Sequence, residues 1–414
     1  RFYLALYFAK VLNFIINIVD KTRGSNLSGE KAMKIDPLMV KHFKGIDPEK
    51  VLFITGTNGK STTNNLIAHI FKDNGKTIVT NLEGANLIYG VATTLSKASD
   101  FAGRVKADYF IFETDERFLP IIHKQLPAKN IMITNLQKDQ VQRNGDPDFI
   151  FRKLYGKLEG DIRYFLNNDE PRTKAFEDVA SEIVTYGVEK HSESFEKPES
   201  FPGMACPKCR GKIKFKYFNN DGVGKFECLD CGHKSNEEVN YQATKLDFEN
   251  KTFEINGVNF NMPYDMPFMQ YNYTGAVAVA KEFGDIEVED AAKSFSSFEN
   301  IEKTDAIINI TPTLSRTGAE FERNETLLTV AQIYKKPLIY VNKVGAIDNF
   351  SYDGASRIYN EKGEIMEIEA PIHVSNVKVI TDTKVKEAKV KDVKPKEVTT
   401  EKKTFTYTFK MKDS

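Results

Sequence analysis

The chain lacks an excess of charge of either sign. Its 414 residues include 58 basic and 58 acidic side chains, so the formal net charge is zero. A balanced chain carries no overall field that attracts nucleic acid or a bulk anionic surface, and we expect no nucleic-acid partner. The length predicts two or three domains.

The chain also lacks a long uninterrupted apolar run. Residues 2–19 are rich in apolar side chains, but Lys10, Asn13 and Asn17 interrupt them, and no small-residue cleavage site follows. Neither a membrane-spanning helix nor a signal peptide is therefore predicted, and we expect a cytoplasmic protein. Residues 1–45 form an N-terminal helical segment, whose helix is amphipathic. Packing on the first domain is favoured for it, and lying on the inner face of a membrane is the alternative.

Cysteine is scarce, and all four cysteines belong to two C-x-x-C pairs, which the hairpin-forming sequence 219–222 separates. Four thiolates close a tetrahedral shell around one ion, which makes structural Zn²⁺ the favoured interpretation. Two disulfides or a redox motif are the alternatives, and the missing signal peptide weighs against an oxidising compartment. We predict a zinc ribbon over residues 203–236, with the ligands Cys206, Cys209, Cys228 and Cys231.

The most informative feature present is a glycine-bracketed turn between an apolar strand, 51–54, and a helix with apolar spacing, 61–71. Such a turn collects backbone N–H groups around an anion, and its lysine and hydroxyl residues suit phosphates and Mg²⁺. The pattern is a P-loop variant, because Ile54 occupies the position of the first P-loop glycine. It predicts ATP binding by Gly56, Thr57, Asn58, Gly59, Lys60, Ser61 and Thr62.

Strands and helices alternate after this turn, which predicts an α/β fold with a parallel sheet. Strand 109–113 ends in Glu113, and strands 131–134 and 164–166 also end in polar residues. Parallel sheets bind ligands beyond the carboxyl ends of their strands, so Glu113 is placed to hold Mg²⁺. The alternative is a carboxylate that caps the next helix, a role that suits Asp115 better than Glu113.

Several segments together resemble the Mur ligase family. The segments are 56–63, 83–86, 113–116, Asn135 with 139–140, and 167–171. The four-cysteine ribbon and the N-terminal segment make the chain most similar to the MurT type, the ligase subunit of lipid II isoglutaminyl synthase. The resemblance covers residues 1–300, with a central ATP-binding domain over 46–300 into which the ribbon is inserted.

The resemblance implies a peptidoglycan ligase that uses ATP to activate the α-carboxylate of D-glutamate in lipid II as an acyl phosphate. Ammonia from a separate glutaminase subunit of the GatD type would complete the amide. Lys60 and Glu113 would be catalytic, with Ser61 and Glu113 as Mg²⁺ ligands. The resemblance also suggests nucleotide contacts for Asn167, Asp169 and Asn272, although Met269 stands where the family has the first of two asparagines.

Residues 301–380 resemble instead the later half of a nitrilase-fold glutaminase domain, as in glutamine-dependent NAD synthetase. Nitrilases need a cysteine nucleophile, and the cysteines here are all in the ribbon, so this partial α/β segment is not expected to be a working amidase. Residues 381–414 are predicted to be a charged linker and tail. The irregular tail leaves a non-catalytic nucleotide-binding scaffold as one alternative function, and a different Mur-type amino-acid ligase as another.

Overall fold

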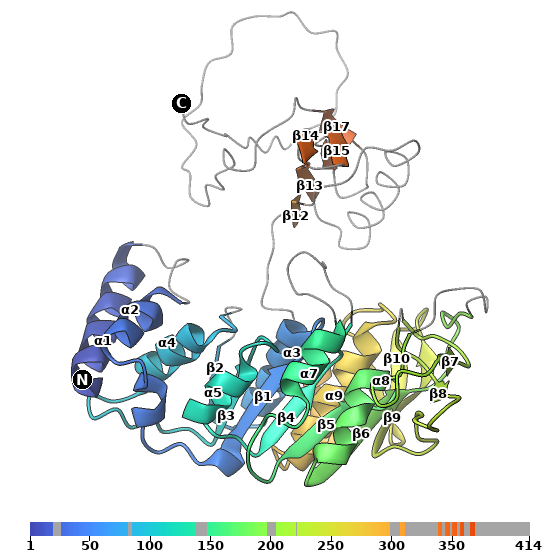
Figure 1. Cartoon of the computed structure of the whole chain (residues 1–414), viewed down its shortest axis with the longest axis horizontal. Coiled ribbons are helices and arrows are strands. Elements are labelled where there is room, and N and C mark those ends of the chain that lie inside the picture. The colour runs from blue at the N-terminus through green and yellow to red at the C-terminus, as the bar shows by residue number, and fades with distance from the viewer. Residues whose placement is uncertain are drawn as a thin grey trace, which may run out of the picture. The chain divides into compact units, whose positions relative to one another are not determined.

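The computed structural model describes residues 1–19, 26–81, 85–137, 147–196, 204–220 and 222–298, together with short strands between residues 307 and 368. The chain divides into two units, residues 1–301 and residues 302–414 (Figure 1). The predicted nucleotide and cysteine residues belong to the first unit.

One sheet forms the centre of the first unit. Its described strands lie in the order β11-β10-β9-β6-β5-β4-β1-β3-β2. Strands β1 to β6 pair with one another in parallel. Strand β10 pairs with β9 and with β11 in antiparallel fashion. The strands are β1 (Val51–Thr55), β2 (Ile78–Thr80), β3 (Tyr109–Glu113), β4 (Asn130–Ile133), β5 (Arg163–Asn167), β6 (Glu182–Val188), β9 (Tyr241–Asp247), β10 (Thr252–Ile255) and β11 (Val258–Asn261).

Helices cover both faces of this sheet, as Figure 1 shows. Successive side chains of β1 point into two different hydrophobic cores. Leu52 and Ile54 belong to the core with α3 and α9. Val51 and Phe53 belong to the core with α4 and α5. The helices are α1 (Phe2–Val19), α2 (Leu27–Ile35), α3 (Lys60–Asp73), α4 (Ile88–Ala98), α5 (Leu119–Gln125), α7 (Pro147–Leu154), α8 (Pro171–Lys174), α9 (Met269–Glu282) and α10 (Val288–Phe295), with short 3₁₀ turns η1 (Met39–His42), η2 (Pro48–Lys50) and η3 (Ala175–Val179).

This arrangement confirms the predicted α/β fold with a parallel sheet. The strand predicted over 51–54 and the helix predicted over 61–71 are β1 and α3. The antiparallel extension by β10 and β11 was not predicted, because its alternating burial is that of an ordinary surface hairpin and nothing local indicates which sheet edge it joins.

The cysteine module lies between β6 and β9 in the chain. Its strands β7 (Ile213–Phe215) and β8 (Phe226–Cys228) are antiparallel, as the predicted hairpin requires. Ile213 and Phe226 are buried beside Cys206 and Cys228, which gives the module a small apolar core of its own.

The second unit is described only by its strands. Strands β12 (Ile307–Ile310), β13 (Leu338–Val341), β16 (Arg357–Tyr359) and β17 (Ile365–Ile368) form one sheet, and β14 (Val344–Ile347) pairs with β15 (Phe350–Asp353). The first two strands are parallel, whereas the other pairs are antiparallel. The nitrilase-like segment stays a prediction, and the predicted tail over 381–414 lies outside the described residues.

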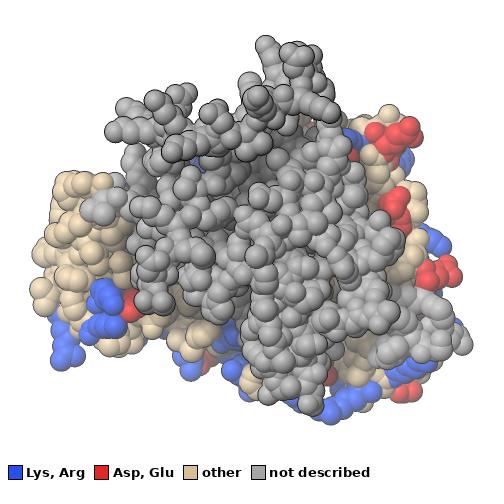
Figure 2. Space-filling model, turned by 90° about the horizontal axis from the view of Figure 1, so that it is seen from above, with Lys and Arg blue, Asp and Glu red and all other residues tan. Residues whose placement is uncertain are grey.

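The surface of the first unit carries charges of both signs. In Figure 2 basic and acidic side chains alternate along the described edge of the molecule, whereas the end at the left is mostly uncharged. That uncharged end corresponds in Figure 1 to the region of α1 and α2.

Candidate functional site

The loop between β1 and α3 is held in a conformation that needs its two glycines. Gly56 has φ +129° and Gly59 has φ +81°. A Cβ atom on Gly56 would lie 2.4 Å from the Thr134 hydroxyl oxygen. Gly59 is the N-cap of α3 and has no side chain to satisfy the first N–H groups of that helix. This helix terminus therefore offers backbone donors and a positive dipole to an anion.

The residues that follow β4 hold this loop in place. The Thr57 N–H donates to the Asn135 carbonyl at 2.7 Å, and the Asn58 N–H donates to the Asn135 side chain at 3.1 Å. Asn135 and Thr134 in turn donate to the Asn58 carbonyl, at 2.9 and 2.7 Å. The N–H groups of Thr57 and Asn58 are therefore used to fix the loop, and this fixed conformation preorganises the N–H groups that follow at the start of α3.

Lys60 lies across the loop. Its ammonium group donates to the carbonyls of Gly56 and Thr57 and lies 3.7 Å from a carboxylate oxygen of Glu116. Burial raises the pKa of Glu116, an effect that the charge of Lys60 only partly offsets. Glu116 belongs to the segment 113–116, but the sequence suggested no role for it. An acid shortly after a strand that neighbours the P-loop strand is the signal that could have identified it.

Glu113 lies at the carboxyl end of β3, next to the loop. The strand register pairs it with Ile54, two residues before Gly56, and its side chain is buried. The Asn86 amide donates to its carboxylate at 3.5 Å, and Asn81 holds its backbone N–H and carbonyl with bonds of 2.8 Å. A carboxylate in this place is suited to hold Mg²⁺ beside phosphates on the loop.

Asp115 has a different surrounding, in the turn before α5, but it does not cap that helix, whose N-cap is Phe118 with no side-chain cap. Its carboxylate accepts from the Arg117 N–H at 2.9 Å and pairs with the Arg117 guanidinium at 2.6 Å. Burial pushes the pKa of Asp115 upward, but the hydrogen bonds and charge of Arg117 outweigh it and hold the pKa below its usual value. Glu113 makes no such turn contact among the described residues, so the two acids can be told apart by geometry.

Two hydroxyls at this edge of the sheet fit a ligand that the chain does not supply. The hydroxyl oxygens of Thr63, in the first turn of α3, and Thr114, after Glu113, are buried without a hydrogen-bond partner in the described part of the chain. Buried polar atoms are nearly always paired, so unpaired ones beside the loop favour a polar ligand there. With Glu113 and the hydroxyl residue Ser61, the donor set fits a nucleotide with its Mg²⁺.

Asn272 is brought to the loop from the start of α9. A Cβ atom on Gly59 would lie 2.4 Å from the Asn272 side-chain oxygen, so the two residues are in direct contact. The Asn272 amide lies 3.6 Å from the Met269 sulfur. Met269, one turn before Asn272 in α9, is thus in direct contact with it.

Asn167 and Asp169 lie farther inside the protein. The Asn167 side chain bonds the Thr134 carbonyl at 3.4 Å and the Asp169 N–H at 3.0 Å. One Asp169 oxygen accepts from the Val188 N–H and the Tyr271 hydroxyl, both at 3.0 Å, and burial raises the Asp169 pKa. Both side chains connect β5 to its surroundings in this conformation, so contacts from them to a nucleotide stay a prediction.

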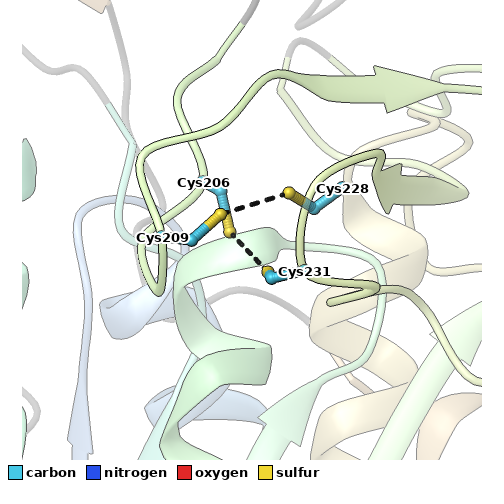
Figure 3. A group of neighbouring side chains, drawn as sticks. All are labelled: Cys206, Cys209, Cys228 and Cys231. Atoms are coloured by element: carbon cyan, nitrogen blue, oxygen red, sulfur yellow. Dashed lines mark hydrogen bonds between the residues drawn. The ribbon is translucent and has the colours of Figure 1, made fainter.

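The four cysteines converge on one point, as Figure 3 shows. Their sulfurs all lie within 4.8 Å of one another, with Cys206–Cys231 at 3.7 Å and Cys209–Cys228 at 3.5 Å. A tetrahedron with Zn–S bonds of about 2.3 Å has sulfurs about 3.8 Å apart, so the set fits one Zn²⁺. The thiols are free, whereas the disulfide alternative needs sulfurs about 2 Å apart.

The two knuckles differ in how strongly they favour thiolate, and it is Cys228 of the second knuckle whose pKa is lowered. Burial raises the pKa of Cys206 to about 12. At Cys228 burial acts in the same direction, but the N–H groups of Cys231 and Asp230 outweigh it and lower the pKa to about 7. Gly232 supplies the left-handed turn of the second knuckle, whereas in the first knuckle the left-handed residue is Arg210.

The cysteine module is joined to the segment that follows β5. His233 shares a hydrogen bond of 2.7 Å with the Pro171 carbonyl, and the Gly224 N–H donates to the Asp169 carbonyl at 2.9 Å. Glu170, between these residues, accepts from the Leu136 N–H at 3.3 Å. Leu136 follows Asn135, so a continuous set of hydrogen bonds connects the module to the loop between β1 and α3.

Three residues of the segments that resemble Mur ligases have no described structure. Glu83, Asp139 and Gln140 lie outside the described residues. The structure brings together the loop residues 56–62, Glu113 and Asn272 at one edge of the sheet, and the four cysteines at a second centre.

Comparison with known proteins identifies the domain that carries this edge. The family model of the Mur ligase middle domain matches residues 54–203. A second model, the C-terminal domain of large ribosomal subunit protein uL24, matches residues 354–403, most of which lie outside the described residues.

The chain is 28% identical over 338 residues to the lipid II isoglutaminyl synthase (glutamine-hydrolyzing) subunit MurT of Staphylococcus aureus, covering 79% of this chain and 75% of that protein. It is 28% identical over 268 residues to the protein of the same name from Streptococcus pneumoniae, covering 63% and 59%. Among solved structures, a pseudomurein peptide ligase type C from Methanothermus fervidus matches with a TM-score of 0.51 and 19% identity, covering 76% of this chain and 69% of that one. The predicted resemblance to Mur ligases and to MurT-type subunits is confirmed.

Proposed function

We propose that this chain, a homologue of MurT-type subunits with a Mur ligase middle domain, is an ATP-dependent amide ligase that amidates lipid II in peptidoglycan synthesis. One observation carries the proposal: the glycine loop, Lys60 and Glu113 meet at the carboxyl edge of a Mur-type sheet. The relatives' names supply the substrate, the D-glutamate α-carboxylate of lipid II being the group that becomes isoglutamine.

In the first step a carboxylate oxygen of the substrate attacks the γ-phosphorus of ATP, and ADP leaves. The loop N–H groups and the N-terminus of α3 hold the phosphates, while Lys60 moves from the carbonyls of Gly56 and Thr57 to the transferred group. Ser61 and Glu113 would hold Mg²⁺, which neutralises phosphate charge when bound. The carboxylate of the neighbouring Glu116 lies 3.7 Å from the Lys60 ammonium group.

In the second step ammonia attacks the carbonyl carbon of the acyl phosphate, loses a proton, and expels phosphate to leave the amide. Positioning supplies most of such a rate enhancement, because the reacting groups need only be held together with water excluded. We propose that a separate glutaminase subunit of the GatD type supplies the ammonia; the names of the relatives, subunits of a glutamine-hydrolysing enzyme, support a partner subunit.

The cysteine module has a structural role in this proposal. Four thiolates leave no open position on Zn²⁺, so the ion would support the fold of the ribbon, which is bonded to the segment after β5. Its connection through Glu170 to Leu136 lets the ribbon support the loop without contributing to the chemistry.

The proposal is tested by ADP release from the purified chain with ATP, Mg²⁺, detergent-dispersed lipid II and ammonium chloride. Free ammonia replaces the partner subunit, so the assay isolates the ligase. We expect ADP release to require lipid II, and we expect ammonium to complete the reaction. A protein that binds ATP but releases no ADP under these conditions would be a nucleotide-binding scaffold, and ADP release that requires an amino acid in place of ammonium would indicate a different Mur-type ligase.

A further inference from the structure

The outward face of α1 is apolar along its whole length. Eight of its side chains that are aliphatic or aromatic lie exposed at helical spacing, and the largest exposed fractions are 69% at Ile18, 67% at Phe14 and 64% at Leu4. The full set is Tyr3, Leu4, Tyr7, Phe8, Val11, Phe14, Ile15 and Ile18. The opposite face is already used, because Ala5, Leu6 and Ala9 are buried in the core of the unit. The helix is therefore apolar both where it packs and where it is exposed.

The one charged side chain between Phe2 and Val19, Lys10, is bonded to the end of α4, and its ammonium group lies 5.5 Å from the centre of the Phe101 ring. Lys10 donates to the Ser96 carbonyl at 2.8 Å, at the end of α4, and burial lowers its pKa. The exposed face is thus about 27 Å long, and none of the side chains that form it is charged. In the part of the chain that is described, no helix is long and apolar enough to cross a membrane.

A further aromatic side chain extends the apolar face. Phe101 is 72% exposed, and its ring lies 6.2 Å from that of Tyr7. A continuous exposed apolar surface made of this many large side chains marks an interaction site. We call the eight exposed residues of α1 together with Phe101 the outer apolar face. Figure 2 shows the uncharged surface at this end of the molecule.

Basic side chains outnumber acidic ones on the elements that pack against α1. The elements packed against α1 are α2, α4 and η1, and they carry Lys31, Lys34, Lys41 and Lys97. Their one acid, Glu30, lies 3.3 Å from Lys34 and is paired with it. Within their bounds these three elements therefore carry a net positive charge, and the acids Asp36 and Asp100 follow α2 and α4 in the chain.

We propose that the outer apolar face lies in the interfacial region of an anionic lipid bilayer and holds the enzyme at the membrane. An interfacial helix buries its apolar side chains at the boundary of headgroups and acyl chains, and nearby lysines bind anionic lipid. Tyrosine and phenylalanine at the N-terminal half suit that boundary. The proposal deepens the proposed function and rests on it, because a lipid-anchored substrate would be met at the same surface.

The charge pattern favours lipid over a second copy of the chain. In a symmetric dimer the same basic elements of two copies would face each other, which is unfavourable, whereas an anionic bilayer complements them. The eight exposed side chains of α1 named above are apolar or aromatic, so they offer few of the hydrogen bonds that usually fix a protein interface.

The test is flotation of the full chain with vesicles of phosphatidylglycerol and phosphatidylcholine that contain no lipid II. We expect the wild type to float with these vesicles and to bind much less to phosphatidylcholine alone. The double variant Phe14→Gln, Ile18→Gln should lower binding by about tenfold or more, because two apolar anchors are lost. The matched control is Ile121→Gln, Phe149→Gln, which changes side chains with exposed fractions of 53% and 47% elsewhere on the unit and should bind normally.

The inference is overturned if the wild type does not float, or if the α1 double variant floats as well as the control variant. It is also overturned if sedimentation shows a dimer that only the α1 double variant loses, while vesicle binding is equal for both variants. Ammonium-dependent ADP release with detergent-dispersed lipid II should be the same in all three proteins. Loss of vesicle binding with intact ADP release therefore separates this inference from the proposed function.

Discussion

Replacing Gly59 with alanine adds one methyl group where the loop turns into α3. The backbone there has φ +81°, which costs an alanine about 1–2 kcal/mol relative to glycine. The loss of freedom in the unfolded chain returns about 0.4–1 kcal/mol of this. The methyl group would also lie 2.4 Å from the Asn272 side-chain oxygen, so Asn272 must move away from the loop. We expect a stability loss of about 1 kcal/mol and, separately, weaker ATP binding.

Gly75 provides the matched control at the other end of α3. It has φ +72°, and a Cβ atom there would meet nothing within 4 Å. Gly75→Ala should therefore cost about the same 1 kcal/mol of unfolding free energy in urea denaturation, with no change in the KM for ATP. For Gly59→Ala we expect the KM to rise about tenfold or more, which corresponds to about 1.4 kcal/mol of binding.

The double variant Gly59→Ala, Asn272→Ala separates the two effects. If contact with Asn272 causes the binding defect, the two substitutions should be strongly non-additive, because the methyl group no longer displaces a side chain that binds nucleotide. The reasoning is refuted if Gly59→Ala has the same KM for ATP as Gly75→Ala.

Three further predictions concern the charge on the loop, the cysteine centre and a half-buried histidine. Lys60→Ala should reduce ATP turnover about a hundredfold or more, while Lys72→Ala in the same helix should not; near-normal turnover in the first variant would sink the P-loop assignment. Cys209→Ser should lower both the zinc content measured by metal analysis and the melting temperature, and an unchanged zinc content would count against the ribbon. Burial lowers the pKa of His191 from 6.5 to about 4, so the folded state disfavours its protonation, and wild-type stability should fall as pH drops through that window. His191→Phe should show a shallower fall in urea denaturation across pH 6.5 to 4, and an identical pH dependence would contradict this role.

The nucleotide loop could be predicted because its signals are local. The apolar run of β1 and the apolar spacing of α3 bracket two glycines, and each of these features determines structure within a few residues. Glu113 was placed correctly at the edge of the sheet for the same reason, since parallel strands bring their carboxyl ends together. The cysteine centre is another local pattern, in which each pair forms its own knuckle.

The surroundings of Asn167 and Asp169 could not be predicted, because they depend on contacts distant in sequence. The Asp169 carboxylate accepts a hydrogen bond from the Tyr271 hydroxyl, 102 residues away in the chain. The Asp169 carbonyl accepts one from the Gly224 N–H of the cysteine module. No pattern near residue 169 indicates which part of the chain will cover it. The approach of Glu116 to Lys60 is similar, because it depends on the turn after β3.

The exposure of α1 was only half predictable. The apolar spacing of residues 2–19 indicated an amphipathic helix, but it could not show that one apolar face would pack while a second would remain exposed. That distinction needs the positions of α2 and α4, which decide how much of the helix is covered.

The most direct test of the proposed function is the mass of the lipid product. The purified chain would be incubated with ATP, Mg²⁺, detergent-dispersed lipid II and isotope-labelled ammonium chloride, and the lipid extracted for mass spectrometry. We expect a product in which a hydroxyl group is replaced by an amino group carrying the label, with fragmentation locating it at the D-glutamate α-carboxyl. Unchanged lipid II in the presence of bound ATP would contradict an amidating ligase.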